Sequence, residues 1–170
     1  MQNCTYLNIE YDKQFIIDFC LKYKDSWYKK GGGWGSPHLE LRPNIRPEIY
    51  EDFTSNKEIL SIYKQLGEEI HEGRIFFKFF EPMFTFARHK DNQRTVGIII
   101  PLTTFHDPIE LLDDEFNVIE SIVYTTPIAF NAQAIHQVRP IKEQRWQMQI
   151  SIHNEPYKEY IQRCPVIKSV

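Results

Sequence analysis

The segment RIFFKFFEPMFTFARHKDNQRTVGIIIPL (residues 74–102) contains three short runs of aromatic and β-branched residues, separated by a proline and by a charged stretch. Runs of this length and composition, interrupted in this way, are typical of β-strands. Two later runs have the same character. We therefore predict strands at residues 74–80, 83–88, 95–102, 118–124 and 145–152. No helical periodicity separates them, so the sheets are expected to be mainly antiparallel.

Upstream of this region the periodicity is helical. Phe15, Phe19 and Tyr23 recur at helical spacing after Asp12, which predicts a helix over about residues 12–23. A second helix is predicted from Ser55 or Asn56 onward, because its apolar residues repeat on one side: Ile59, Ile62, Tyr63, Leu66 and Ile70. A short third helix is predicted at 156–161. Between the first two helices, four glycines and a proline at residues 29–37 predict a loop.

Together these elements predict one domain, mainly β with flanking helices: a two-sheet jelly roll whose N-terminal helices pack on one outer face. A chain of 170 residues seldom divides into two domains. We expect residues 1–72 to form a helical support and loop, 73–155 the jelly-roll core, and 156–170 a C-terminal helix and tail. The Gly31–Gly35 segment with Trp34 is either a flap over a site or a solvated connector.

Composition excludes several classes of function. The net charge of -3 provides no basic field for a phosphate backbone, so nucleic-acid binding is disfavoured. No apolar run approaches the roughly 20 residues of a membrane span, and the first residues do not resemble a signal peptide, so a cytoplasmic location is expected. The three cysteines are scattered, which indicates neither a disulfide framework nor a zinc knuckle, and Cys20 is expected in the core of the first helix.

A candidate metal site begins at His89-Lys90-Asp91, directly after a predicted strand. Strand alternation directs residues i and i+2 to the same side, so His89 and Asp91 can converge on one ion. Alone this pair is equally compatible with an exposed loop. His136, at the start of another strand-like segment, adds a second imidazole that a two-sheet fold can bring opposite the first. Two imidazoles and one carboxylate form the facial triad of Fe(II) oxygenases, which leaves coordination positions open.

Arg145 begins a strand in which polar and apolar residues alternate: Arg145, Gln147, Gln149 and Ser151 on one face, and Trp146, Met148, Ile150 and Ile152 on the other. The common meaning of such alternation is a sheet with one wet outer face. The alternative is that the polar face lines the mouth of a barrel, where Arg145 would bind an anionic cosubstrate through its fork of donors.

These residues resemble the 2-oxoglutarate and Fe(II)-dependent dioxygenase superfamily, particularly its prolyl-hydroxylase-like branch. The likeness rests on His89-x-Asp91, on Arg94, and on His136-x-Val138-x-Pro140 with Arg145, and it covers about residues 74–152. It implies a double-stranded β-helix, a cupin-like jelly roll. It also implies Fe(II) held by His89, Asp91 and His136, with 2-oxoglutarate held by Arg145. The implied reaction uses dioxygen to hydroxylate a small-molecule or peptide substrate, and it releases succinate and carbon dioxide.

The chain departs from this pattern at one point. Prolyl hydroxylases have a tyrosine on the strand after the HxD motif that helps arginine to hold 2-oxoglutarate, whereas residues 98–103 read IIIPLT. Thr103, Tyr124 and Gln147 are the candidate replacement donors, and the sequence does not choose among them. Two other classes fit part of the pattern: a cupin-type jelly roll that binds zinc or manganese without 2-oxoglutarate, and a structural jelly roll whose triad is coincidental. Only the oxygenase requires Arg145.

Overall fold

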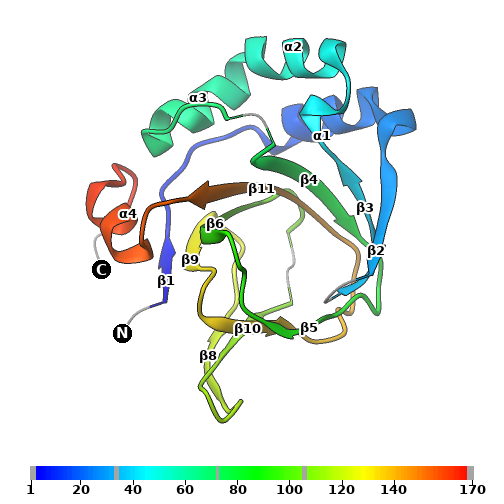
Figure 1. Cartoon of the computed structure of the whole chain (residues 1–170). Coiled ribbons are helices and arrows are strands. Elements are labelled where there is room, and N and C mark those ends of the chain that lie inside the picture. The colour runs from blue at the N-terminus through cyan, green and yellow to red at the C-terminus, as the bar shows by residue number, and fades with distance from the viewer. Residues whose placement is uncertain (1–2, 33–34, 72, 105–106, 168–170) are drawn as a thin grey trace.

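The computed structural model describes residues 3–32, 35–71, 73–104 and 107–167, and within them the chain is mainly β (Figure 1). The helices are α1 (Lys13–Lys22), α2 (Pro47–Ser55), α3 (Lys57–Leu66) and α4 (Tyr157–Arg163), with short 3-10 turns at Lys24–Ser26 and Pro43–Ile45. The strands are β1 (Cys4–Tyr6), β2 (Tyr28–Gly32), β3 (Gly35–Leu41), β4 (Ile75–Phe80), β5 (Phe86–His89), β6 (Arg94–Pro101), β7 (Ile109–Leu112), β8 (Val118–Ile122), β9 (Ile128–Asn131), β10 (Ile135–Val138) and β11 (Arg145–His153).

The strands form two layers, as predicted for a jelly roll. The larger layer has the order β1-β9-β6-β11-β4-β3, with β2 paired to β3, and the smaller layer has the order β5-β10-β7-β8. All of these pairings are antiparallel. The layers join where Gly35 of β3 pairs with Phe86 of β5. Figure 1 shows α1, α2 and α3 over the outer face of the larger layer, with the smaller layer on the opposite side.

Polar and apolar residues alternate along β11, so one face of this strand packs into the apolar core under the helices and the other faces the space between the two layers. Met148, Ile150 and Ile152 belong to the apolar cluster that packs against the helices, as does the fully buried Cys20 of α1. The polar residues of the strand are also buried, from Arg145 at 3% exposed to Gln149 at 6%. The polar face of β11 is therefore an interior surface, and the interpretation of this alternation as a wet outer face is wrong.

Local sequence explains where the helices begin and end. The side chain of Asn56 accepts hydrogen bonds from the backbone N–H groups of Glu58 and Ile59, so it caps the start of α3. Gly67, at φ 67°, ends the same helix in the left-handed conformation that glycine adopts without steric cost. Between these caps the apolar side of α3 is buried against the larger sheet, which confirms the predicted second helix, although the helix ends at Leu66 and Ile70 lies beyond it.

The N-terminal third contains more strand than its composition predicts. The loop prediction for residues 29–37 is wrong, because β2 and β3 pair there and β3 also pairs with β4. Pairing on both sides of β3 outweighs the conformational cost of glycine. Strands β1, β7 and β9 and helix α2 were not predicted. The suggested flap at Gly31–Gly35 includes residues 33–34, which lie outside the described residues.

None of the helices in the described part of the chain has the length and hydrophobicity needed to cross a bilayer.

Gly97 of β6 packs closely against the Phe130 ring, which also lies near His136. It pairs with Phe130 of β9, and a Cβ atom at Gly97 would lie 2.7 Å from Cζ of the Phe130 ring and closer still to Cε1. The Phe130 ring in turn lies 5.3 Å from the His136 ring.

We expect Gly97→Ala to lower the free energy of unfolding by about 1–3 kcal/mol, because the ring must shift within a packed interior. Urea unfolding followed by circular dichroism measures this change. Gly31→Ala is the matched control, since its Cβ would meet Pro37 at an ordinary 3.5 Å. Equal stabilities for the two variants would contradict the assigned packing.

Candidate active site

Two histidines from neighbouring strands of the smaller sheet face each other across a backbone pair. His89 at the end of β5 is the register partner of His136 in β10, and their ring centres lie 4.3 Å apart. Nδ1 of His89 lies 2.7 Å from the carbonyl oxygen of Ala87, and Nδ1 of His136 lies 2.9 Å from that of Ala134. A carbonyl oxygen can only accept, so each Nδ1 carries the proton. This tautomer directs the lone pair of each Nε2 to a metal.

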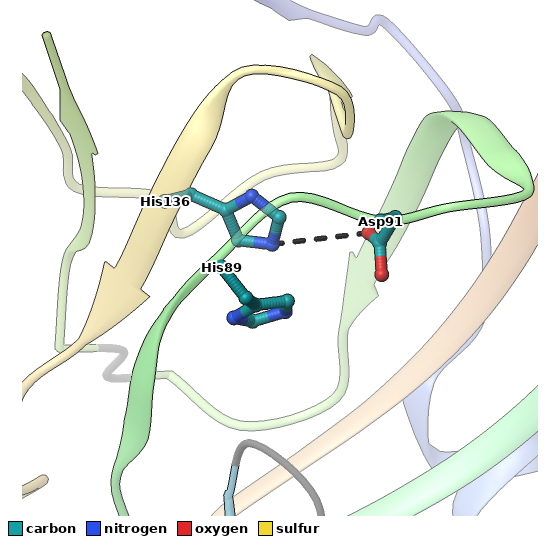
Figure 2. Close-up of side chains that lie close together, drawn as sticks. All are labelled: His89, Asp91 and His136. Atoms are coloured by element: carbon teal, nitrogen blue, oxygen red, sulfur yellow. Dashed lines mark ion pairs between the residues drawn. The ribbon is translucent and has the colours of Figure 1, made fainter. Parts of the chain in front are cut away.

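Asp91 follows β5 and completes the cluster (Figure 2). One carboxylate oxygen, Oδ2, lies 3.8 Å from Nε2 of His136, and the candidate ligand atoms of His89, Asp91 and His136 all lie within 4.8 Å of one another. Arg94 of β6 donates to Oδ2 from Nε at 3.0 Å and from Nη2 at 2.5 Å. The structure thus brings together the three residues that the sequence placed in a metal site, with Arg94 orienting the carboxylate.

The environment of His136 favours the neutral imidazole that metals bind. Burial lowers the pKa of His136 to about 4. The bond to Ala134 and the charge of Asp91 act against this shift, while His89 and Arg94 add to it. At neutral pH the ring therefore has no extra proton to lose before it coordinates an ion.

The triad lies on the wall of a cavity of about 680 Å³ between the two sheets, and Arg145 lines the same cavity. Nη1 of Arg145 donates to the carbonyl oxygen of Asp107 at 3.2 Å, and the guanidinium lies 4.9 Å from the centre of the Phe80 ring. Its Nε is buried and has no hydrogen-bond partner among the described residues. An unsatisfied donor on a buried cation is costly, and a carboxylate that binds the guanidinium would remove that cost.

The three candidate helpers of Arg145 lie in different places. Tyr124, which follows β8, is fully buried, lines the cavity and donates its hydroxyl proton to Oε1 of Gln147 at 3.3 Å. Burial raises the pKa of Tyr124 although Arg145 opposes the shift, so the hydroxyl remains a donor. Gln147 of β11 also lines the cavity. Thr103 instead accepts from the backbone N–H of Trp146 at 3.4 Å and is not part of the cavity lining.

A polar cluster on β3 and β4 forms the wall that sequence analysis missed. Glu40 is 1% exposed and accepts hydrogen bonds from Tyr28 at 2.8 Å and from Arg42 at 2.6 Å, and its other oxygen lies 3.5 Å from Nε2 of His38. Burial acts to raise the pKa of Glu40, but His38, Lys78, Arg42 and Tyr28 hold it well below its usual range. His38 and His153 also line the cavity, although neither was predicted as a site residue.

Solved structures with this arrangement of strands include several oxygenases. A Trichoplax adhaerens prolyl hydroxylase, in complex with a hypoxia inducible factor oxygen degradation domain peptide fragment, has a TM-score of 0.53 and 16% identity over 89% of this chain and 81% of its own. A 2OG-Fe(II) oxygenase family oxidoreductase of Burkholderia pseudomallei has a TM-score of 0.55 and 13% identity over 81% and 76%. The non-heme alpha ketoglutarate dependent epimerase SnoN, from nogalamycin biosynthesis, has a TM-score of 0.56 and 9% identity over 87% and 75%.

The class of fold is therefore the jelly roll of 2-oxoglutarate and Fe(II) oxygenases, as the resemblance over residues 74–152 implied. No protein-family model and no curated protein matches this chain. Because one fold hosts many activities, the chemistry follows from the residues of the cavity and not from the likeness alone.

If the triad binds a divalent metal, we expect His136→Gln to weaken Mn(II) binding at least 100-fold. Loss of a ligand should exceed the roughly 10–100-fold effect of losing an outer-shell partner. The electron paramagnetic resonance signal of free Mn(II) measures the affinity. His153→Gln is the matched control, because His153 lines the same cavity outside the triad. Equal weakening in both variants would place the metal elsewhere.

Proposed function

We propose that this chain is a non-haem Fe(II) and 2-oxoglutarate-dependent oxygenase. The observation that carries the proposal is that one cavity contains both the His89, Asp91 and His136 triad and a buried arginine whose Nε lacks a partner among the described residues. The triad alone fits any divalent metal site. Arg145 adds a buried binding point for a carboxylate, which a plain metal site does not need. The fold of the solved oxygenases supports the same assignment.

The donor set fits Fe(II) together with a chelating oxo acid. His89 and His136 would bind the metal through Nε2 and Asp91 through its carboxylate, which leaves positions open for 2-oxoglutarate and dioxygen. The bound cofactors supply the oxidation of a substrate C–H bond, with succinate and carbon dioxide as co-products. Arg145 would bind the distal carboxylate of 2-oxoglutarate. Tyr124 donates its single hydroxyl proton to Oε1 of Gln147, and it would turn this proton to the carboxylate when 2-oxoglutarate binds.

The remaining side chains control access of water. Phe80, Ile99, Ile109, Phe130 and Val138 line the cavity around these polar groups, and all five are at most 5% exposed. An apolar wall strengthens the pairing of Arg145 with a carboxylate because it lowers the local dielectric constant. It also keeps bulk water away from the reacting carbon, which is the part of the chemistry that the protein contributes.

The proposal predicts a spectroscopic signal that depends on both the triad and Arg145. When Fe(II) and then 2-oxoglutarate are added under argon, we expect a visible charge-transfer band from the oxo acid chelated to iron. His136→Ala should abolish the band. Arg145→Ala should require at least tenfold more 2-oxoglutarate to produce it, because a charged hydrogen-bonding partner is lost.

Arg139→Ala is the matched control for arginine, since the Arg139 side chain is two-thirds exposed and pairs with Glu110. It should leave the band unchanged. Metal binding without a band in the wild type would favour the cupin-type alternative, which uses the same triad and needs no Arg145. If no metal binds, the triad is coincidental in a structural jelly roll.

The band also tests which residue replaces the missing tyrosine of the prolyl-hydroxylase pattern. We expect Tyr124→Phe to raise the 2-oxoglutarate concentration at half-saturation by about tenfold, as one hydrogen bond to a charged group is lost. Thr103→Val should have no effect, because Thr103 is not part of the cavity lining. The reverse result would assign the role to Thr103.

A further inference from the structure

Lys78 places a positive charge in the cavity that the metal triad also lines. It lies on β4 between Glu40 of β3 and Gln147 of β11 in the strand register, and all three line the cavity. Its Nζ lies 5.6 Å from the centre of the Phe76 ring on the same strand and 5.9 Å from that of Phe86 on the opposite sheet. The Phe86 ring lies 5.7 Å from the His89 ring. The ammonium group therefore extends from the larger sheet toward the triad.

No hydrogen bond or ion pair holds this ammonium group among the described residues. Within the described parts of the chain, its close contacts are those with the two aromatic rings. The neighbouring carboxylate of Glu40 is already bound by Tyr28, Arg42 and His38. Burial lowers the pKa of Lys78 to about 8, with Glu40 acting in the opposite direction. A charged donor within a cavity and without a partner is available to an anion.

The charge of the whole cavity has the same sign. Among the described lining residues, the cations are Lys30, Arg42, Lys78, Arg94 and Arg145, and the carboxylates are Glu40 and Asp91. The cavity is thus positive although the chain carries a net charge of -3. A cleft of one sign with low-dielectric walls concentrates ligands of the opposite sign. Glu40 does not provide a site for a cationic ligand, because both its oxygens are occupied by neighbours.

Of the five cations, Lys30 and Arg42 pair with Glu40, Arg94 binds Asp91 and Arg145 is assigned to 2-oxoglutarate, which leaves Lys78. Arg145 lies beyond Gln147 along β11, where Tyr124 adjoins it. The volume of about 680 Å³ lies in the range of pockets for drug-sized ligands, roughly 300–1,000 Å³. Once 2-oxoglutarate is bound, the remaining space suits a small molecule.

We propose that the oxygenase substrate is a small molecule bearing an anionic group, a carboxylate or a phosphate, and that Lys78 binds this group beside the metal. This inference rests on the proposed function, because it assumes that Arg145 and the triad are taken by the cofactors. Lys78 would be a specificity-determining residue: it would fix the anionic end of the substrate and so select which carbon faces the metal.

The test uses the full chain loaded with Mn(II) and saturating 2-oxoglutarate. The probes are acetate, as a carboxylate, and methyl phosphate, as a phosphate ester. An anion bound near Mn(II) has its methyl proton resonance broadened by the paramagnetic ion. We expect saturable broadening by the wild type, and the probe with the higher affinity identifies the substrate class. Lys78→Met should weaken the binding about tenfold or more, whereas Lys78→Arg should retain it.

Lys90→Met is the matched control, because Lys90 is more than half exposed, pairs with Asp114 and lies outside the cavity lining. It should leave the broadening unchanged. Retained binding in Lys78→Met, or no saturable binding in the wild type, would overturn the inference. Loss of the anaerobic charge-transfer band in Lys78→Met would also overturn it, since Lys78 would then serve 2-oxoglutarate.

The two failures can be told apart. The wild-type charge-transfer band is absent if the proposed function is wrong. It is present, with no Lys78-dependent broadening, if only the substrate inference is wrong. The band in Lys78→Met also shows that the variant is folded.

Discussion

The structure depends on the position of β11 at the centre of the larger sheet, where it pairs with β4 on one side and β6 on the other. Strand alternation gives it two buried faces of opposite character. The apolar face anchors the helices to the sheet, and the polar face supplies Arg145 and Gln147 to the cavity. Packing of the helices and positioning of the cofactor site are therefore coupled through one backbone, because a shift of one residue in register would exchange the two faces.

The smaller sheet positions the three residues of the triad. Its pairing of β5 with β10 sets the separation of the two imidazoles, and the chain that leaves β5 returns Asp91 to the same point. Neither sheet contains a whole site, since the triad side chains come from β5, its following turn and β10, while Arg145 comes from β11. The cavity exists because the layers face each other, joined on one side through Gly35 and Phe86.

Sequence analysis identified the parts of this arrangement that have a short-range pattern. His89 and Asp91 are two residues apart after a strand, and the period of two in residues 145–152 is visible without any tertiary information. His136 and the two-sheet jelly roll were also predicted from the residues, the resemblance agreed with both, and the solved structures confirm the fold. The sequence did not choose among Thr103, Tyr124 and Gln147, because the approach of Tyr124 to Gln147 in the cavity lining is a tertiary contact between residues far apart in the chain.

The cavity wall that contains Glu40 and Lys78 could not be predicted from the sequence either, because it also depends on tertiary contacts. Lys78 lies in an aromatic run that predicted only a strand, and Glu40 lies just beyond a glycine-rich segment that was interpreted as a loop. Their proximity follows from the pairing of β3 with β4, which joins segments almost forty residues apart. Local composition carries no information about such a pairing. Glycine content predicted a loop because the conformational cost of glycine is a local property, whereas the strand pairing that outweighs this cost is a tertiary contact.

The backbone contacts of the two histidines have a consequence for how metal affinity arises. Each imidazole is held by the backbone carbonyl two residues before it, and Asp91 is held by Arg94, so the rotamers of all three residues are set when the sheets form. If these residues bind a metal, as proposed, the entropy of ordering them is a cost of folding and not of metal binding. Changes that strengthen or loosen the strands can therefore tune metal affinity over evolutionary time without altering any ligand.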